Sequence, residues 1–212
     1  MELAYLHPAF FKPKINVFKL LKIKETSPYV IVRFVSWKAI HDIGKKGLSD
    51  EQKIQIVNEL STHAKVFISS EIEIPAELKQ YEINIEPHLM HDVIANASLM
   101  YSESSTMAAE AAVLSIPSIY VSPSKRGYVD ELANKYNLIV PFNNTQDETK
   151  KSLHKSIELI KQPNIQQEWQ QKRQKMLSEK INASAFLIWF IENYPQSAEV
   201  MKENPDYQYY FK

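Results

Sequence analysis

The amino-acid sequence predicts an α/β fold in which a parallel sheet carries helices on its faces. Short segments rich in β-branched and aromatic residues alternate along the chain with segments whose apolar residues recur at helical spacing. The short segments are apolar on both faces, which is typical of parallel strands covered by helices. With 212 residues and no cysteine, the chain is long enough to bury a core without disulfides.

The predicted strands and helices follow one another in strict alternation. Five segments are predicted to be strands: Tyr29–Val35, Lys65–Ser69, Ser98–Ser102, Ser118–Ser122 and Leu138–Phe142. Between the first two, a helix is predicted from Ser49, a typical N-cap, and it places Ile54, Val57 and Leu60 on one face. Shorter helical patterns follow at 90–97, 105–114 and 128–136. This order predicts a parallel sheet.

The last third of the chain is predicted to be helical. An amphipathic pattern stops at Pro163, a polar helix follows with Trp169, Met176 and Leu177 on its apolar side, and "SAFLIWFIENY" closes the helical region before Pro195. No glycine linker separates these helices from the sheet domain. We therefore expect an interdomain segment at 1–28, a sheet domain at 29–162, and C-terminal helices at 163–212 packed on it. The aromatic tail "NPDYQYYFK" is expected to be docked or interfacial.

Composition excludes several classes of protein. Twenty-five basic and 25 acidic residues give a net charge of zero, which argues against a general nucleic-acid binder. Without cysteine there are no thiolate metal sites, and we expect no metal and no cofactor. The N-terminus lacks a signal-peptide pattern, and "AFLIWFI" is far shorter than the ~20 residues of a membrane span. A soluble cytoplasmic protein is the expectation.

The stretch "YSESSTMAAEAAVL" is a candidate anion site, because it runs from a predicted strand through hydroxyls into a helix. Ligands of parallel sheets bind beyond the carboxyl ends of strands, and a helix start favours phosphate. Ser104, Ser105 and Thr106 supply hydroxyls, and Glu110 shares a helix face with Thr106. The alternative is that the hydroxyls only cap the helix and Glu110 is solvated.

Other polar residues follow the predicted strands at the same edge. The loop after the first strand carries Arg33, Ser36 and the pair His41–Asp42, which is the candidate for an acid–base step. The remaining candidates on this rim are Ser69, Glu71, His88, His91, Asp92, Glu103, Lys125 and Arg126. For each of them a solvated loop or turn is the alternative. The chain has no P-loop, no glycine-rich dinucleotide fingerprint and no G-x-S-x-G motif, which disfavours kinases, dehydrogenases and hydrolases.

The chain resembles the domain-of-unknown-function 354 family of bacterial and archaeal proteins. The stretches that carry the resemblance are "ELAYLHPAFFKP", "VIVRFVSWKAIHD", "KVFISSE", "HDVIANASLMYSESSTMAAEAAVL" and "FLIWFIENYP". That family is similar to GT-B glycosyltransferases and to UDP-N-acetylglucosamine 2-epimerase. The resemblance implies that the chain is a Rossmann-like domain, the C-terminal, nucleotide-sugar-binding half of a GT-B fold. A second, N-terminal Rossmann-like domain would be separate or missing.

The resemblance also implies roles for single residues. Ser104, Ser105 and Thr106 would face the diphosphate of the donor, and Glu110 the ribose. Arg33 and Ser36 are further candidates for the diphosphate, and the segment His88–Asp92 would lie by the base. Ser115 stands where these relatives usually have glycine, and a positive φ at this turn would strain it.

The expected function is therefore that of the donor-binding domain, with a UDP-sugar as ligand, of a GT-B-type glycosyltransferase in surface polysaccharide synthesis. Two alternatives remain open. One is a UDP-sugar 2-epimerase or hydrolase. The other is a non-catalytic nucleotide-binding or interaction module. In that case the aromatic tail, or the face that the missing N-terminal domain leaves exposed, would contact a partner or a second copy.

Overall fold

The fold of the chain was obtained as a computed structural model that describes residues 3–38 and 44–212. Its centre is a five-stranded sheet in which every neighbouring pair is parallel, in the order β2-β1-β3-β4-β5. The strands are β1 (Tyr29–Phe34), β2 (Lys65–Ser70), β3 (Leu99–Ser102), β4 (Ser118–Val121) and β5 (Ile139–Phe142). All five predicted strands are confirmed, with ends that differ by one residue.

The strand order creates a switch point between β1 and β3. From β1 the chain crosses to β2 on one side, and all later strands add on the other side. Val30 therefore pairs with Val66 of β2 and also with Leu99 of β3. In open parallel sheets the crevice beyond the carboxyl ends of strands at such a point is the usual ligand site.

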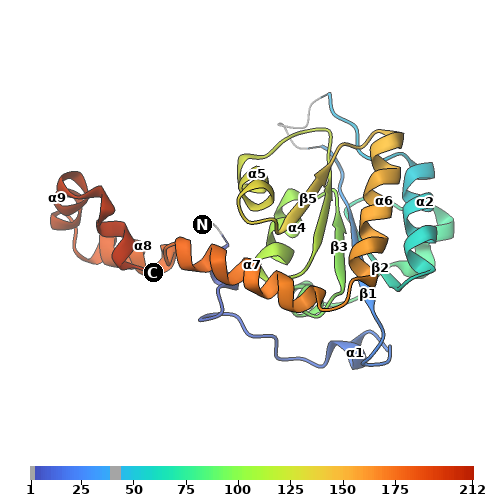
Figure 1. Cartoon of the computed structure of the whole chain (residues 1–212), viewed down its shortest axis with the longest axis horizontal. Coiled ribbons are helices and arrows are strands. Elements are labelled where there is room, and N and C mark those ends of the chain that lie inside the picture. Colours follow the sequence, from blue (N-terminus) through green and yellow to red (C-terminus); the bar gives the residue numbers. More distant parts are fainter. Residues whose placement is uncertain (1–2, 39–43) are drawn as a thin grey trace.

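Helices cover both faces of the sheet (Figure 1). One face carries α2 (Asp50–Ser61) and α6 (Gln146–Lys161), and the other carries α3 (Met90–Ala95), α4 (Ser105–Val113) and α5 (Gly127–Asn134). Short 3-10 turns, η3 (Ala76–Tyr81) and η4 (Pro87–Leu89), connect β2 to α3. The Rossmann-like architecture expected from the sequence is confirmed.

Helix α2 shows how the local sequence sets an element. The Ser49 hydroxyl accepts the N–H of Gln52, and the Gln52 side chain accepts the N–H of Ser49, which completes a capping box. Val57 and Leu60 are buried as predicted, whereas Ile54 is only half-buried. The Gln52 amide donates to the Thr149 hydroxyl at 2.8 Å, which ties α2 to α6.

The N-terminal segment lies against the sheet domain. It contains η1 (Ala4–Leu6) and α1 (Val17–Leu20). Leu3, Leu6 and Val17 are buried in the core. The segment expected to be an interdomain connection is thus packed on the domain before β1 begins.

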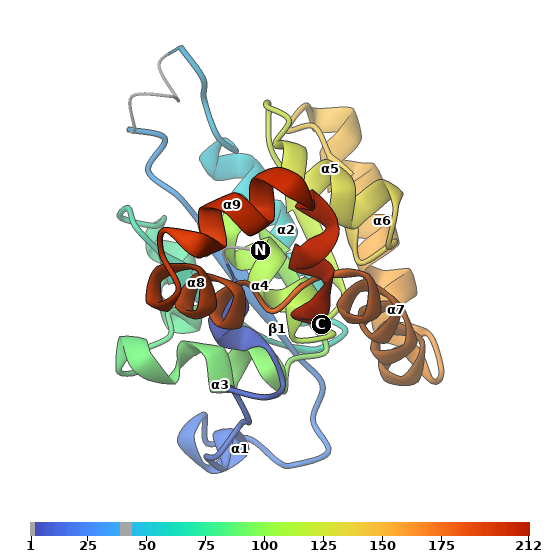
Figure 2. The same ribbon diagram turned by 90° about the vertical axis from the view of Figure 1, so that its left-hand side faces the viewer.

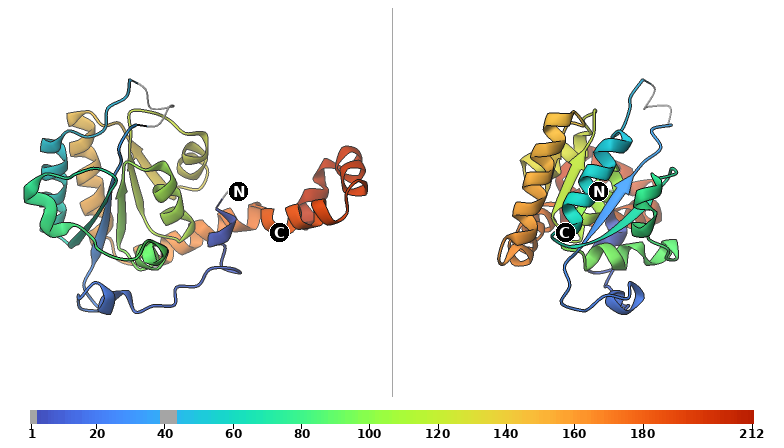
Figure 3. Two further views of the ribbon diagram at one scale, coloured as in Figure 1. Left: turned by 180° about the vertical axis from the view of Figure 1, so that it is seen from behind. Right: turned by 90° about the vertical axis from the view of Figure 1, so that its right-hand side faces the viewer.

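The C-terminal helices divide into two groups. Helix α7 (Ile165–Glu179) packs on the domain through buried Trp169 and Met176, and the indole of Trp169 donates to the Leu138 carbonyl at 3.0 Å. Helices α8 (Ala183–Glu192) and α9 (Gln196–Glu203) with η5 (Pro205–Tyr210) instead project beyond the domain as an arm (Figures 1 and 3). The expectation that the whole region 163–212 packs on the sheet domain thus describes α7 alone.

The C-terminal arm, residues 182–212, packs mainly on itself. No residue of α8 is buried. Its aromatic residues meet the tail: the rings of Trp189 and Tyr207 stack at 4.8 Å, and those of Phe186 and Phe211 meet edge-on at 5.6 Å. Figure 2 looks at the domain from the side of the arm, with α8 and α9 in front. The aromatic tail thus covers one side of α8, and the sheet domain does not bury the helix.

No helix within residues 3–38 and 44–212 combines the length and apolar character that crossing a membrane requires.

Candidate functional site

A polar pocket of about 190 Å³ opens at the carboxyl edge of β1, β3 and β4. Several residues singled out in the sequence meet there from separate loops. The polar pocket is lined by Val35, Ser36, Trp37, Glu71, Glu103, Ser104, Ser105, Thr106, Tyr120 and Arg126. It lies beside the switch point of the sheet, where a ligand is expected.

The start of α4 forms one wall of the polar pocket. Ser104 is the N-cap, and its hydroxyl accepts the N–H of Met107 at 3.3 Å. The Ser102 hydroxyl accepts the N–H of Ser104 at 2.8 Å. Ser105 and Thr106 occupy the first two helical positions, whose N–H groups have no acceptor within the helix. The capping interpretation therefore holds for Ser104, while Ser105 and Thr106 present donors to the pocket.

Glu103 holds the loop after β1 in place. Its side chain is buried and accepts hydrogen bonds from Leu48 N at 2.7 Å and from the Trp37 indole at 3.1 Å. Burial raises the pKa of this carboxyl above its usual range, and the hydrogen bonds oppose that rise. Gly47 passes so close that a Cβ there would lie 2.2 Å from the Trp37 nitrogen. Glu103, predicted to be a rim residue, thus serves the architecture of the pocket.

Arg33 and Glu71 form an ion pair at the edge of the polar pocket. The guanidinium donates to Glu71 at 2.5 Å and to the Ser69 hydroxyl at 2.7 Å. The other oxygen of Glu71 accepts the N–H of Ser36 at 3.2 Å. Ser36 and Glu71 therefore line the polar pocket, whereas Arg33 does not.

Arg126 brings positive charge to the polar pocket. It precedes α5 and lines the pocket, whereas its exposed neighbour Lys125 does not. Burial raises the pKa of the nearby Tyr120, and the positive charge of Arg126 opposes the rise. Of the two predicted basic residues, the structure brings only Arg126 to the helix start.

Glu110 lies one turn further along α4 and is buried. The Tyr5 hydroxyl donates to its Oε1 at 2.8 Å, and the His91 Nε2 lies 3.2 Å from the same oxygen. Asp92 points elsewhere, since its Oδ1 accepts the N–H groups of Lys14 and Ile15 at 2.7 and 3.4 Å. Glu110 and His91 therefore lie in contact, while Asp92 anchors the N-terminal segment.

His88 lies in η4 and is exposed. The candidate catalytic pair His41–Asp42 lies outside the described residues. Within the part of the chain that the structure describes, no group of three or more His, Cys, Asp or Glu side chains is placed to hold a metal ion.

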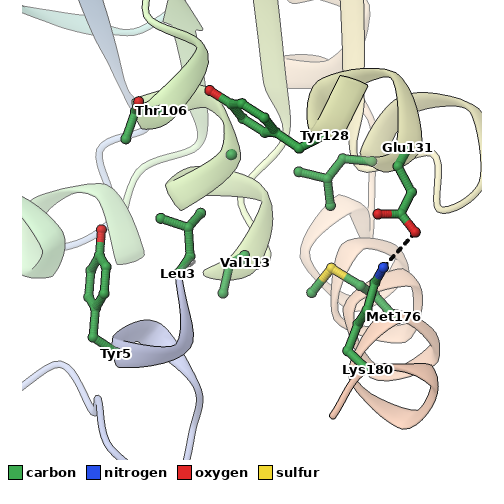
Figure 4. Close-up of a pocket in the computed structure, with 10 residues that line it drawn as sticks. Leu3, Tyr5, Thr106, Val113, Tyr128, Glu131, Met176 and Lys180 are labelled. Atoms are coloured by element: carbon green, nitrogen blue, oxygen red, sulfur yellow. Dashed lines mark hydrogen bonds and ion pairs between the residues drawn. The ribbon is translucent and has the colours of Figure 1, made fainter. Parts of the chain in front are cut away.

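A second, larger cavity of about 460 Å³ adjoins the polar pocket, because Thr106 lines both. Figure 4 shows Leu3 and Tyr5 entering it from the N-terminal segment, opposite α4, α5 and α7. Its floor is apolar, and an ion pair between Glu131 and Lys180 closes one side. The sequence did not reveal Leu3 and Tyr5 as site residues. Tyr5 is 105 positions from its partner Glu110, and no local pattern marks such a contact.

Among the comparisons with known proteins, only the one with solved structures supports the fold. No protein-family model matches the chain, and no curated protein matches its sequence. The resemblance to the domain-of-unknown-function 354 family therefore stays a prediction.

Several solved structures are similar to the chain, including the following three. The spinosyn rhamnosyltransferase SpnG superimposes with a TM-score of 0.51 and 12% identity, over 86% of this chain and 50% of that one. The calicheamicin glycosyltransferase CalG4 gives a TM-score of 0.51 and 16% identity, over 87% and 46%. A putative UDP-N-acetylglucosamine 2-epimerase from Listeria monocytogenes gives 0.49 and 6%, over 74% and 41%.

The two glycosyltransferases show that the fold is the Rossmann-like α/β fold of GT-B glycosyltransferase structures. The chain spans about half the length of those chains.

Proposed function

We propose that this domain binds a nucleotide sugar, with UDP as the nucleotide, and serves as the donor-binding part of a GT-B-type glycosyltransferase. One observation carries the proposal: the first-turn donors of α4, the hydroxyls of Ser105 and Thr106 and the cation Arg126 line a single pocket. That pocket lies at the switch point of a fold shared with glycosyltransferases. A diphosphate is the ligand group that suits helix N–H groups, hydroxyls and an arginine together.

The charges around the polar pocket are compatible with a diphosphate. Both carboxylates that line it are engaged, since Glu71 is paired with Arg33 and Glu103 is buried under its own hydrogen bonds. The positive end of the α4 dipole and Arg126 then act on the ligand. In sugar transfer the same groups would stabilise the negative charge that develops on the departing diphosphate.

The sugar-nucleoside part would follow α4. A rise of about 6 Å separates residues four positions apart in a helix, so Glu110 would meet the ribose when the diphosphate sits at Thr106. His88 and His91 would lie toward the base, and His41 with Asp42 would supply any acid–base step. A role in surface polysaccharide synthesis and a cytoplasmic location belong to this proposal.

Calorimetric titration with UDP, GDP and CDP tests the proposal. Arg126→Ala removes a pocket cation, and Lys125→Ala is the matched control, because it removes the same charge one residue away on an exposed side chain. A charge-assisted contact contributes about 1.5–3 kcal/mol. R126A should therefore weaken UDP binding about tenfold or more, while K125A should leave it within about twofold.

The absence of binding by all three nucleotides would refute the donor site. Equal losses in R126A and K125A would show that general charge attraction, rather than the polar pocket, is responsible.

The exposed face of α8 supports a second element of the proposal, a partner domain. Leu187, Ile188, Ile191 and Tyr194 are exposed by 54 to 71% on the C-terminal arm, and such a patch is typical of an interface. We propose that it packs on a second Rossmann-like domain, which would bind the acceptor. The chain spans about half of the similar glycosyltransferase chains.

Sedimentation equilibrium tests this element against self-association. The purified chain should remain monomeric at micromolar concentration. A dimer that Ile188→Lys with Ile191→Lys dissociates would show instead that the face joins two copies.

A further inference from the structure

The N-terminal segment supplies a wall of the proposed nucleoside site. Leu3 and Leu6 are buried in the core, and they hold η1 beside α4. The Asp92 carboxylate fixes the segment a second time through the main chain of Lys14 and Ile15. Tyr5 is therefore held at α4 by anchors on both sides of it. Tyr5 is itself 48% exposed, so burial of its own side chain does not explain its position.

The Glu110 carboxylate is oriented from one side. Tyr5 and His91 both approach Oε1, at 2.8 and 3.2 Å. A carboxylate accepts hydrogen bonds at two oxygens, and the Tyr5 hydrogen bond and the His91 contact on Oε1 together turn Oε2 toward other groups. His91 is itself held, because its ring lies 5.6 Å from that of Tyr5 and 6.1 Å from that of Phe11.

We infer that Tyr5 and His91 are positioning residues for ligand recognition: they orient the Glu110 carboxylate so that Oε2 accepts the vicinal hydroxyls of a ribose. The inference rests on the proposed function, because it assigns the nucleoside to the face of α4 next to the diphosphate. It adds that discrimination between ribose and deoxyribose depends on the N-terminal segment. Tyr5 also lines the adjoining cavity (Figure 4).

The distinction between a positioning role and a purely structural role lies in which ligands are affected. Loss of stability alone would weaken binding of every nucleotide by the same factor. Loss of carboxylate orientation would weaken only ligands that have ribose hydroxyls. A hydrogen bond to a charged group contributes about 1.5–3 kcal/mol, which corresponds to about tenfold or more in affinity.

The test compares UDP with 2′,3′-dideoxyuridine diphosphate by calorimetry on the full chain. The wild type should bind UDP about tenfold more tightly than the dideoxy analogue. Tyr5→Phe should lose most of this preference while its affinity for the analogue stays within about twofold of the wild type. Tyr136→Phe is the matched control, because Tyr136 also donates to a glutamate, Glu179 at 3.0 Å, away from the site. It should behave as the wild type.

Three outcomes would overturn the inference alone. Y5F could retain the full preference for UDP, or it could weaken both ligands equally. In the third, the wild type binds both ligands with equal affinity, and this binding still depends on Arg126. That result would support the donor site but would refute the role of Glu110 in ribose recognition. No binding of UDP by the wild type would overturn the proposed function as well. Should Y5F not fold in a thermal scan, His91→Ala removes the other Oε1 contact and must show the same selective loss.

Discussion

Substitution of Gly47 by alanine is predicted to disrupt the loop that shapes the polar pocket. An added Cβ would lie 2.2 Å from the Trp37 indole nitrogen and 2.4 Å from the Glu103 carboxylate. Neither atom can give way easily, because the two are hydrogen-bonded to each other at 3.1 Å, and Glu103 also accepts the Leu48 N–H at 2.7 Å. The Cβ must therefore break the bond between Trp37 and Glu103.

The cost follows from the burial of Glu103, which is 3% exposed. A hydrogen bond to a charged group contributes about 1.5–3 kcal/mol, and a buried carboxylate that loses a donor also loses compensation for its desolvation. We expect Gly47→Ala to lower the free energy of unfolding by about 2–4 kcal/mol, within the range of large single-site effects.

Urea unfolding followed by far-ultraviolet circular dichroism measures this loss. Gly127→Ala is the matched control, because nothing lies within 4 Å of a Cβ there, and its effect should stay within about 0.5 kcal/mol. An unfolding midpoint for G47A equal to that of G127A would refute the packing of Gly47 against Trp37 and Glu103.

Two further predictions concern stability. Ser115 has a φ of 62° at the end of α4, where its N–H bonds to Ala112 O and that of Ile116 bonds to Ala111 O, the arrangement in which glycine is preferred. Ser115→Gly should raise the free energy of unfolding by about 1 kcal/mol in urea unfolding, and an unchanged value would contradict the strain. Burial raises the pKa of Glu103 above the ordinary 4.5. Its contribution to stability is therefore present below about pH 4.5 and lost as pH rises through the raised value. The difference in unfolding free energy, wild type minus Glu103→Gln, should fall as pH rises from 4.5. A difference that rises with pH would contradict this assignment.

The sheet could be predicted from the sequence because its signals are local. Each strand is a short run of residues that suit a covered parallel sheet, and the α4 start carries its own caps. The turn after α4 is also a local signal: the sequence indicated that Ser115 would be strained if its φ were positive, and its φ is positive in the structure. The polar candidates meet at one edge because parallel strands all end there.

The parts that could not be predicted depend on long-range packing. Glu103 is buried and supports the loop, whereas Ser105 and Thr106 are more exposed and offer their donors to the pocket. The sequence alone does not show how deeply each of these side chains is buried. The contact between Tyr5 and Glu110 joins the start of the chain to α4 and has no local signature. Helix α8 looks like a core helix by composition, but the aromatic tail covers part of it and the sheet domain does not.

The most direct test of the central claim is to record the amide resonances of the ¹⁵N-labelled chain during titration with UDP. A diphosphate at the start of α4 accepts from the first-turn N–H groups, so the signals of Ser105 and Thr106 should move most, followed by those near Arg126. If the largest changes instead fall at the start of α2 or α6, or if no signal moves at millimolar UDP, the polar pocket is not a nucleotide site.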